Sequence, residues 1–123
     1  MPRGLGTDQR EALLERIAAL LDQYAIQRQT LTYLELADAV AMPGPQRIHR
    51  TTRLLEMLMR RDAAAGRPIR SALVISRTGR GLPAPGFFDY ARRLGLLDSE
   101  DADDFHRRQL AAVYAADTRH PSR

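Results

Sequence analysis

Arginine is the side chain that best equips this sequence for chemistry, and that chemistry is the binding of anions. Between residues 45 and 93 the chain holds eleven arginines against three acidic residues, so this block carries a formal charge of +8. The whole chain carries +4, because the segments on either side of the block are mildly acidic. Cations concentrated in this way are typical of a surface that binds a polyanion such as nucleic acid.

Five of these eleven arginines belong to one predicted helix, residues 45–65, which would be a recognition helix. At about 100° per residue, one arc of this helix is cationic and the opposite arc is mainly apolar, so the second arc should face the core. The predicted core side comprises Ile48, Thr51, Thr52, Leu55, Leu58 and Met59. The predicted nucleic-acid-binding residues on the cationic side are Arg47, His49, Arg50, Arg53, Arg60 and Arg61. Arg70, Arg77 and Arg80 join this predicted site, because they fall where a wing would project beside the helix.

Other reactive groups predict no catalytic centre, metal or cofactor. The chain has no cysteine, which excludes disulfides, thiolate nucleophiles and cysteine-based zinc sites. The acidic run at 98–104 lacks the spacing and the glycine of a calcium loop, and acids are favourable in a first helical turn. No serine or threonine has an evident paired base. We therefore expect no enzymatic activity, and, without a membrane-spanning segment or a signal peptide, a cytoplasmic protein.

The elements before the cationic helix are predicted from capping signals. Asp8 and Glu11 match a capping box, followed by an apolar stripe of helical spacing. That stripe comprises Leu13, Ile17, Leu20, Leu21 and Tyr24. Residues 30–32 predict a brief strand, after which Thr32 and Glu35 form a second capping box for a short helix.

The turn after this second helix and the elements that follow are predicted from proline, glycine and apolar runs. The short helix should end near Ala41, and Pro45 suits the first turn of the next helix. Residues 70–76 predict a buried strand, and 78–86 a loop that delivers Phe87 and Phe88 to the core or to an interface. Two more helices follow at about 87–94 and 99–116, the last one capped by Asp98 or Ser99, and residues 117–123 should form a flexible tail.

This order predicts one domain over residues 1–123, mainly α with a small β component. Residues 8–80 would form a winged helix-turn-helix-like core, in which a short strand precedes the second helix and a wing follows the third. Residues 87–116 would add two C-terminal helices. The sequence leaves the oligomeric state open.

Two stretches resemble known families. Thr32-Tyr33-Leu34-Glu35-Leu36-Ala37, followed by a Pro-Gly-Pro turn, an arginine-bearing helix and Ser71–Ser76, is similar to the alkyltransferase-like winged-helix domain. That family carries a Pro-Cys-His-Arg active site, whereas Pro68-Ile69-Arg70-Ser71 has neither Cys nor His. The resemblance thus implies a DNA-facing scaffold without alkyl transfer. Ser71–Phe88 also resembles small uncharacterised bacterial proteins with a Gly-Leu-Pro-x-Pro-Gly-Phe-Phe segment, which implies no particular chemistry.

The sequence therefore predicts a module that binds nucleic acid, duplex DNA above all, through the cationic helix and the wing. The alternative is an immunity, antitoxin or adaptor protein whose arginine face binds an acidic protein. Exposed apolar side chains among the arginines, at Leu54, Met57 or Phe88, would favour the protein partner. A purely polar stripe would favour phosphate.

Overall fold

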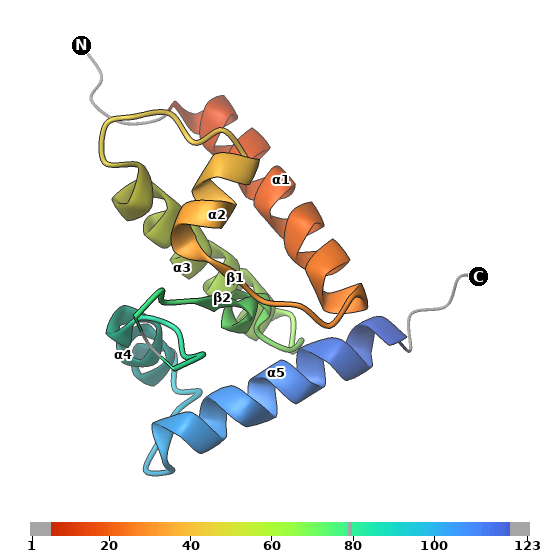
Figure 1. The fold of residues 1–123 in the computed structure, drawn as a ribbon. Helices are drawn as coiled ribbons and strands as arrows, with labels where there is room; N and C mark the ends of the chain where they lie inside the picture. Colours follow the sequence, from red (N-terminus) through yellow and green to blue (C-terminus); the bar gives the residue numbers. More distant parts are fainter. Residues whose placement is uncertain (1–5, 79, 119–123) are drawn as a thin grey trace.

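The computed structural model describes residues 6–78 and 80–118, which fold into a mainly helical protein with a small parallel sheet (Figure 1). In chain order the elements are α1 (Thr7–Ile26), β1 (Leu31–Thr32), α2 (Tyr33–Ala39), α3 (Arg47–Ala64), the 3-10 helix η1 (Arg70–Leu73), β2 (Val74–Ile75), α4 (Pro85–Arg93) and α5 (Ala102–Thr118). The predicted class, mainly α with a small β component, is confirmed. None of the helices in the described ranges is long and apolar enough to cross a membrane.

The two predicted capping boxes have different outcomes. At α2 the prediction is confirmed: the Glu35 amide donates to Thr32 Oγ1 at 3.1 Å, and the Thr32 amide donates to Glu35 Oε1 at 2.9 Å. At α1 it is wrong, because the helix begins two residues earlier and Gly6, not Asp8, is its N-cap, without a side-chain bond. Asp8 lies instead within the first turn, where its charge favours the helix dipole.

The turn between α2 and α3 is longer than predicted, and both helices are shorter. α2 ends at Ala39, and Ala41 adopts a left-handed φ of 55° that no helix continues. Gln46 has a left-handed φ of 59° and is the N-cap of α3, so Pro45 lies outside the helix rather than in its first turn.

α3 buries one stripe against the rest of the molecule, and this stripe differs from the predicted one at its start. Its buried residues are Thr51, Leu54, Leu55, Leu58, Met59 and Asp62. Burial begins at Thr51, so the first turn lies outside the core and the predicted core residue Ile48 is 42% exposed. Thr52 is only partly buried. Leu54, a possible exposed anchor by sequence, is 2% exposed.

The strands form a two-stranded parallel sheet in which Leu31 pairs with Val74 and Thr32 with Ile75. The predicted strand at 70–76 is therefore only half a strand, because its first residues form η1. After β2 the Ser76 amide donates to the Leu82 carbonyl at 2.8 Å, which closes a loop. No strand follows β2 in the described part of the chain, so the winged form of the helix-turn-helix stays a prediction.

Two apolar clusters hold the helices together. The larger one joins α1, α2, α3 and the sheet, and Val113 of α5 belongs to it. The smaller one lies between α3, α4 and α5 and includes Phe87 and Phe105. Phe87 is buried and Phe88 partly buried, with their rings 5.2 Å apart in an edge-to-face arrangement. Of the two alternatives for this pair, a place in the core is therefore better supported than a place at an interface.

α5 runs across the end of the molecule opposite the chain's start, from beside α4 toward the end of α1 (Figure 1). It begins later than predicted, because Asp101 rather than Asp98 or Ser99 caps it: the Asp104 amide donates to Asp101 Oδ2 at 3.1 Å. The helix runs to Thr118, so the predicted tail begins too early, and residues 119–123 lie outside the described ranges.

Candidate nucleic-acid interface

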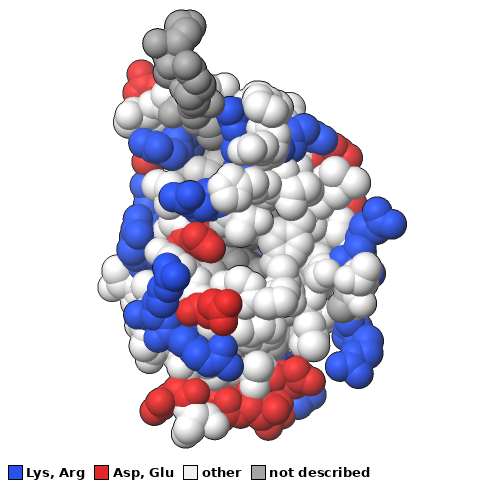
Figure 2. Space-filling view, turned by 90° about the vertical axis from the view of Figure 1, so that its left-hand side faces the viewer, with Lys and Arg blue, Asp and Glu red and all other residues white. Residues whose placement is uncertain are grey.

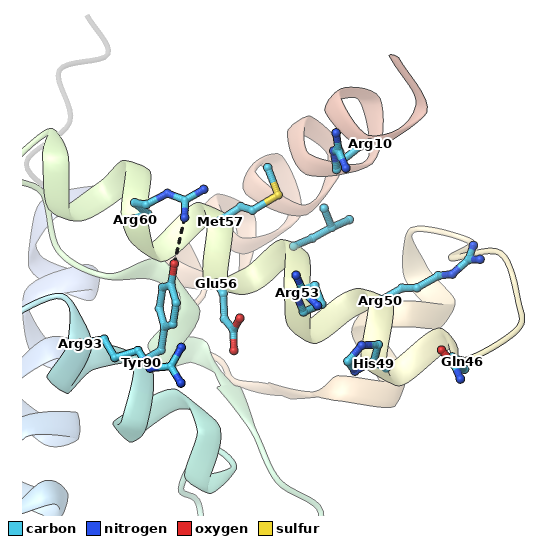
Figure 3. A pocket seen from close by; sticks show the side chains of 11 residues that line it. Arg10, Gln46, His49, Arg50, Arg53, Glu56, Met57, Arg60, Tyr90 and Arg93 are labelled. Carbon is cyan, nitrogen blue, oxygen red and sulfur yellow. Dashed lines mark hydrogen bonds between the residues drawn. The ribbon is translucent and has the colours of Figure 1, made fainter. Parts of the chain in front are cut away.

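A concave surface of about 880 Å³ follows the exposed side of α3 and is flanked by α1 and α4 (Figure 3). We name it the basic groove. Its lining residues are Arg10, Gln46, His49, Arg50, Arg53, Leu54, Glu56, Met57, Arg60, Tyr90 and Arg93. Five arginines and one carboxylate, Glu56, thus face a single open surface. Such a surface can bind phosphate groups through charge and through the donors of the guanidinium groups.

The groove arginines differ in how they are held. Arg60 donates from Nη1 to the Tyr90 hydroxyl at 3.1 Å, which ties α3 to α4 across the groove (Figure 3). Arg50 reaches the Pro43 carbonyl from Nη1 at 3.5 Å. No side-chain hydrogen bond or ion pair within the described ranges involves Arg10, Arg53 or Arg93. These three side chains are able to turn toward a ligand without giving up an internal partner.

Four of the nine predicted site residues line the groove, namely His49, Arg50, Arg53 and Arg60. Arg47 lies at its edge and is engaged inside the molecule. Its Nη2 donates to Asp38 Oδ1 at 2.6 Å and its Nε to the Met42 carbonyl at 2.9 Å. Arg47 therefore fixes the α2–α3 turn. Arg61 pairs instead with Glu11 of α1 at 2.8 Å and does not line the groove.

Arg70 is the clearest departure from the sequence prediction, because it is a partly buried structural residue. Its side chain is 14% exposed and binds Asp62, which is 1% exposed, with Nη2 to Oδ1 at 2.8 Å and Nε to Oδ2 at 3.2 Å. Asp22 Oδ1 of α1 accepts a hydrogen bond from Arg70 Nη1 at 3.3 Å. Burial by itself would lower the pKa of Arg70, but the bonds and charges of Asp62 and Asp22 raise it on balance. Asp62 thus joins α3 to η1.

The other two predicted wing residues, Arg77 and Arg80, are exposed but do not line the groove. Arg80 lines a separate depression against α5, together with Asp103, His106 and Arg107. Arg77 is exposed on the loop after β2. Gly79, also part of this loop, lies outside the described residues. Figure 2 shows acidic side chains gathered at the lower end of the molecule, where α5 begins, and arginines along the edge above them.

The groove also contains residues that the sequence did not indicate. Arg10 comes from α1, and Tyr90 and Arg93 come from α4. Arg93 could have been suspected because it ends the cationic block, but no local pattern marks Arg10. Its place in the groove depends on the packing of α1 beside α3.

None of the apolar side chains that line the groove is fully exposed. Leu54 belongs to the core, and Met57 is partly buried against the larger apolar cluster. Phe88 packs against the smaller cluster and does not line the groove. The described residues contain no group of three or more histidines, aspartates or glutamates that could hold a metal ion. The chemistry available in the groove is therefore that of cations and hydrogen-bond donors.

Comparison with known proteins finds no relative: no family model, no curated protein and no solved structure matches the chain. The two family resemblances of the sequence therefore stay predictions. A function for this chain has to be argued from the site itself.

Proposed function

We propose that this protein binds nucleic acid, and specifically duplex DNA, through the basic groove. The observation that carries the proposal is the meeting of five arginines from three helices on one concave surface. Duplex DNA carries a negative charge about every 1.7 Å along its axis, so a row of cations can neutralise several phosphates at once. α2, the turn and α3 would act as the helix-turn-helix, with α3 in or beside a groove of the DNA.

The accessible lining favours phosphate over an acidic protein as the ligand. A protein-binding surface of this size normally has an apolar anchor at its centre, surrounded by polar residues. Here Leu54 is buried, Met57 is partly buried and Phe88 lies elsewhere. The exposed Ile48 lines a neighbouring depression and not the centre of the groove. Five of the eleven lining residues are arginines and one is acidic, and this excess of cations suits the backbone of a nucleic acid.

Fluorescence anisotropy with a 25-base-pair duplex at several salt concentrations tests this proposal. If each groove arginine neutralises one phosphate, log K should fall with log salt at a slope of about −4.5. The variant Arg53→Ala/Arg93→Ala removes two arginines that have no described partner, so the slope should become about −2.7. Between 50 and 200 mM salt the affinity would then fall about 40-fold in the variant and about 500-fold in the wild type.

The matched control is Arg16→Ala/Arg107→Ala, which removes the same charge from two exposed positions outside the groove. This control should bind DNA with nearly the wild-type slope. Equal losses in both double variants would mean that net charge alone attracts DNA, and the groove would not be the site. No binding at low salt would contradict the proposed function and would favour an acidic protein partner.

A further inference from the structure

The first turn of α3 carries an exposed apolar side chain beside the basic groove. Ile48 is 42% exposed and is one of three large apolar residues so exposed among the described residues. A shallow depression of about 650 Å³ surrounds it, lined by residues 44–49. We name residues 46–49 the α3 tip. Sequence periodicity places Ile48 on the core side of the helix. It is nevertheless exposed, because α3 packs against the core only from Thr51 onward.

This depression is continuous with the basic groove. Gln46 and His49 line both surfaces, so a ligand that follows the groove toward the start of α3 reaches Ile48 next. The α3 tip therefore lies at one end of the row of cations. In a helix-turn-helix that docks in the major groove, the residues at the start of the recognition helix are those that contact base edges.

We propose that the α3 tip reads A·T base pairs in the major groove, with Ile48 packed against the C5 methyl group of thymine. This inference rests on the proposed binding of duplex DNA. Thymine is the only base that presents a methyl group in this groove, so an apolar side chain there distinguishes it from cytosine. The exposed Gln46 amide adds the donor and acceptor that match N6 and N7 of adenine.

The cation next to Ile48 supports A·T rather than G·C recognition. Arginine is the usual partner of guanine O6 and N7, and it needs its guanidinium group free for this bidentate contact. Arg47 has Nη2 on Asp38 and Nε on the Met42 carbonyl, so reading guanine would break both bonds. The α3 tip thus presents the Gln46 amide and the Ile48 side chain to a ligand, whereas the Arg47 guanidinium is engaged by partners within the protein.

Replacement of thymine by uracil tests this reading, because it removes the methyl group and leaves the phosphate count unchanged. Two 25-base-pair duplexes of identical A·T-rich sequence, one with thymine and one with uracil, are titrated at the same salt concentration. Full burial of a methyl group is worth about 0.8 kcal/mol, so the uracil duplex should bind about fourfold more weakly for each methyl contacted. In Ile48→Ala this ratio should fall to nearly one.

Leu34→Ala is the matched control, since Leu34 is 40% exposed on α2 and lies outside both depressions. It should keep the wild-type ratio between the two duplexes. Equal affinity of the wild type for both duplexes would overturn the methyl contact while leaving the proposed DNA binding intact. A ratio that persists in Ile48→Ala would also overturn it, because another group would then read the methyl. No binding to either duplex would remove the inference together with the proposed function.

Discussion

The substitution Asp62→Asn tests whether part of the cationic block, here Arg70, serves to hold the fold together. Asp62 accepts three hydrogen bonds from Arg70: from the backbone amide at 3.1 Å, from Nε at 3.2 Å and from Nη2 at 2.8 Å. Its carboxylate is almost completely buried, so no water replaces these donors. Asparagine has nearly the same shape but no charge, and its amide group would place a donor against the guanidinium donors.

The expected loss of stability follows from the burial of this pair. Removal of one partner from a buried ion pair costs about 3–5 kcal/mol, because the other charge stays buried. Arg70 keeps Asp22 at 3.3 Å, so we expect the lower end, about 3 kcal/mol. An unfolding entropy of about 2.1 cal/mol/K per residue gives roughly 0.26 kcal/mol/K for a chain of this length. The melting temperature should therefore fall by about 12 °C.

Thermal unfolding followed by circular dichroism measures this change, and Glu11→Gln provides the control. Glu11 pairs with Arg61 at a similar distance of 2.8 Å, but both side chains are about half exposed. Such a pair contributes at most about 1 kcal/mol, or a change of roughly 4 °C or less. If Asp62→Asn lowers the melting temperature no more than Glu11→Gln, the Asp62–Arg70 pair does not hold η1 to α3. Arg70→Gln should also be destabilised, yet its DNA binding should keep the wild-type dependence on salt.

Two further predictions concern buried polar groups. Burial raises the pKa of Tyr33, so the folded state holds this proton more tightly than the unfolded state; stability is complete below about pH 10 and falls as the pH rises above it. Tyr33→Phe should reduce this loss of stability in denaturant titrations at pH 9 to 11. At pH 7 the same variant should be less stable than the wild type, because the Ala84 amide loses the Tyr33 hydroxyl as its acceptor at 3.0 Å. Thr51 Oγ1 is buried without a hydrogen-bond partner among the described residues, so Thr51→Val should raise the melting temperature by a few degrees, a gain of about 1 kcal/mol. A lower melting temperature for Thr51→Val would show that the hydroxyl does have a partner.

Local sequence signals predicted an element well wherever the contacts that form it lie within the same few residues as the signal. Thr32 and Glu35 satisfy each other's backbone groups three positions apart, so the start of α2 depends on no distant part of the chain. The mainly helical class of the fold and the position of β1 were also predicted from such local signals. The exact bounds of α3 were missed, because Gln46 adopts a left-handed conformation that neither its type nor its neighbours indicate.

The candidate site was predictable only in part, because a sequence gives the position of a charge but not its partner. Arg53 and Arg70 look alike as arginines of one cationic block, yet one faces the groove and the other is partly buried and ion-paired with Asp62 and Asp22. Asp22 is 48 residues away from Arg70. Arg10 enters the groove through the packing of α1. Such long-range arrangements are set by tertiary structure and leave no local periodicity to detect.

The charge that a DNA molecule would meet is therefore smaller than the block suggests. Several of its arginines have a carboxylate partner within 4 Å among the described residues: Arg47, Arg61, Arg67, Arg70 and Arg92. If all eleven neutralised phosphates, log K would fall with log salt at a slope of about −10, whereas the five groove arginines give about −4.5. The measured slope thus distinguishes a folded groove from a diffuse cationic segment. A value near −10 would mean that the internal ion pairs open when DNA binds, and the groove would then describe only the free protein.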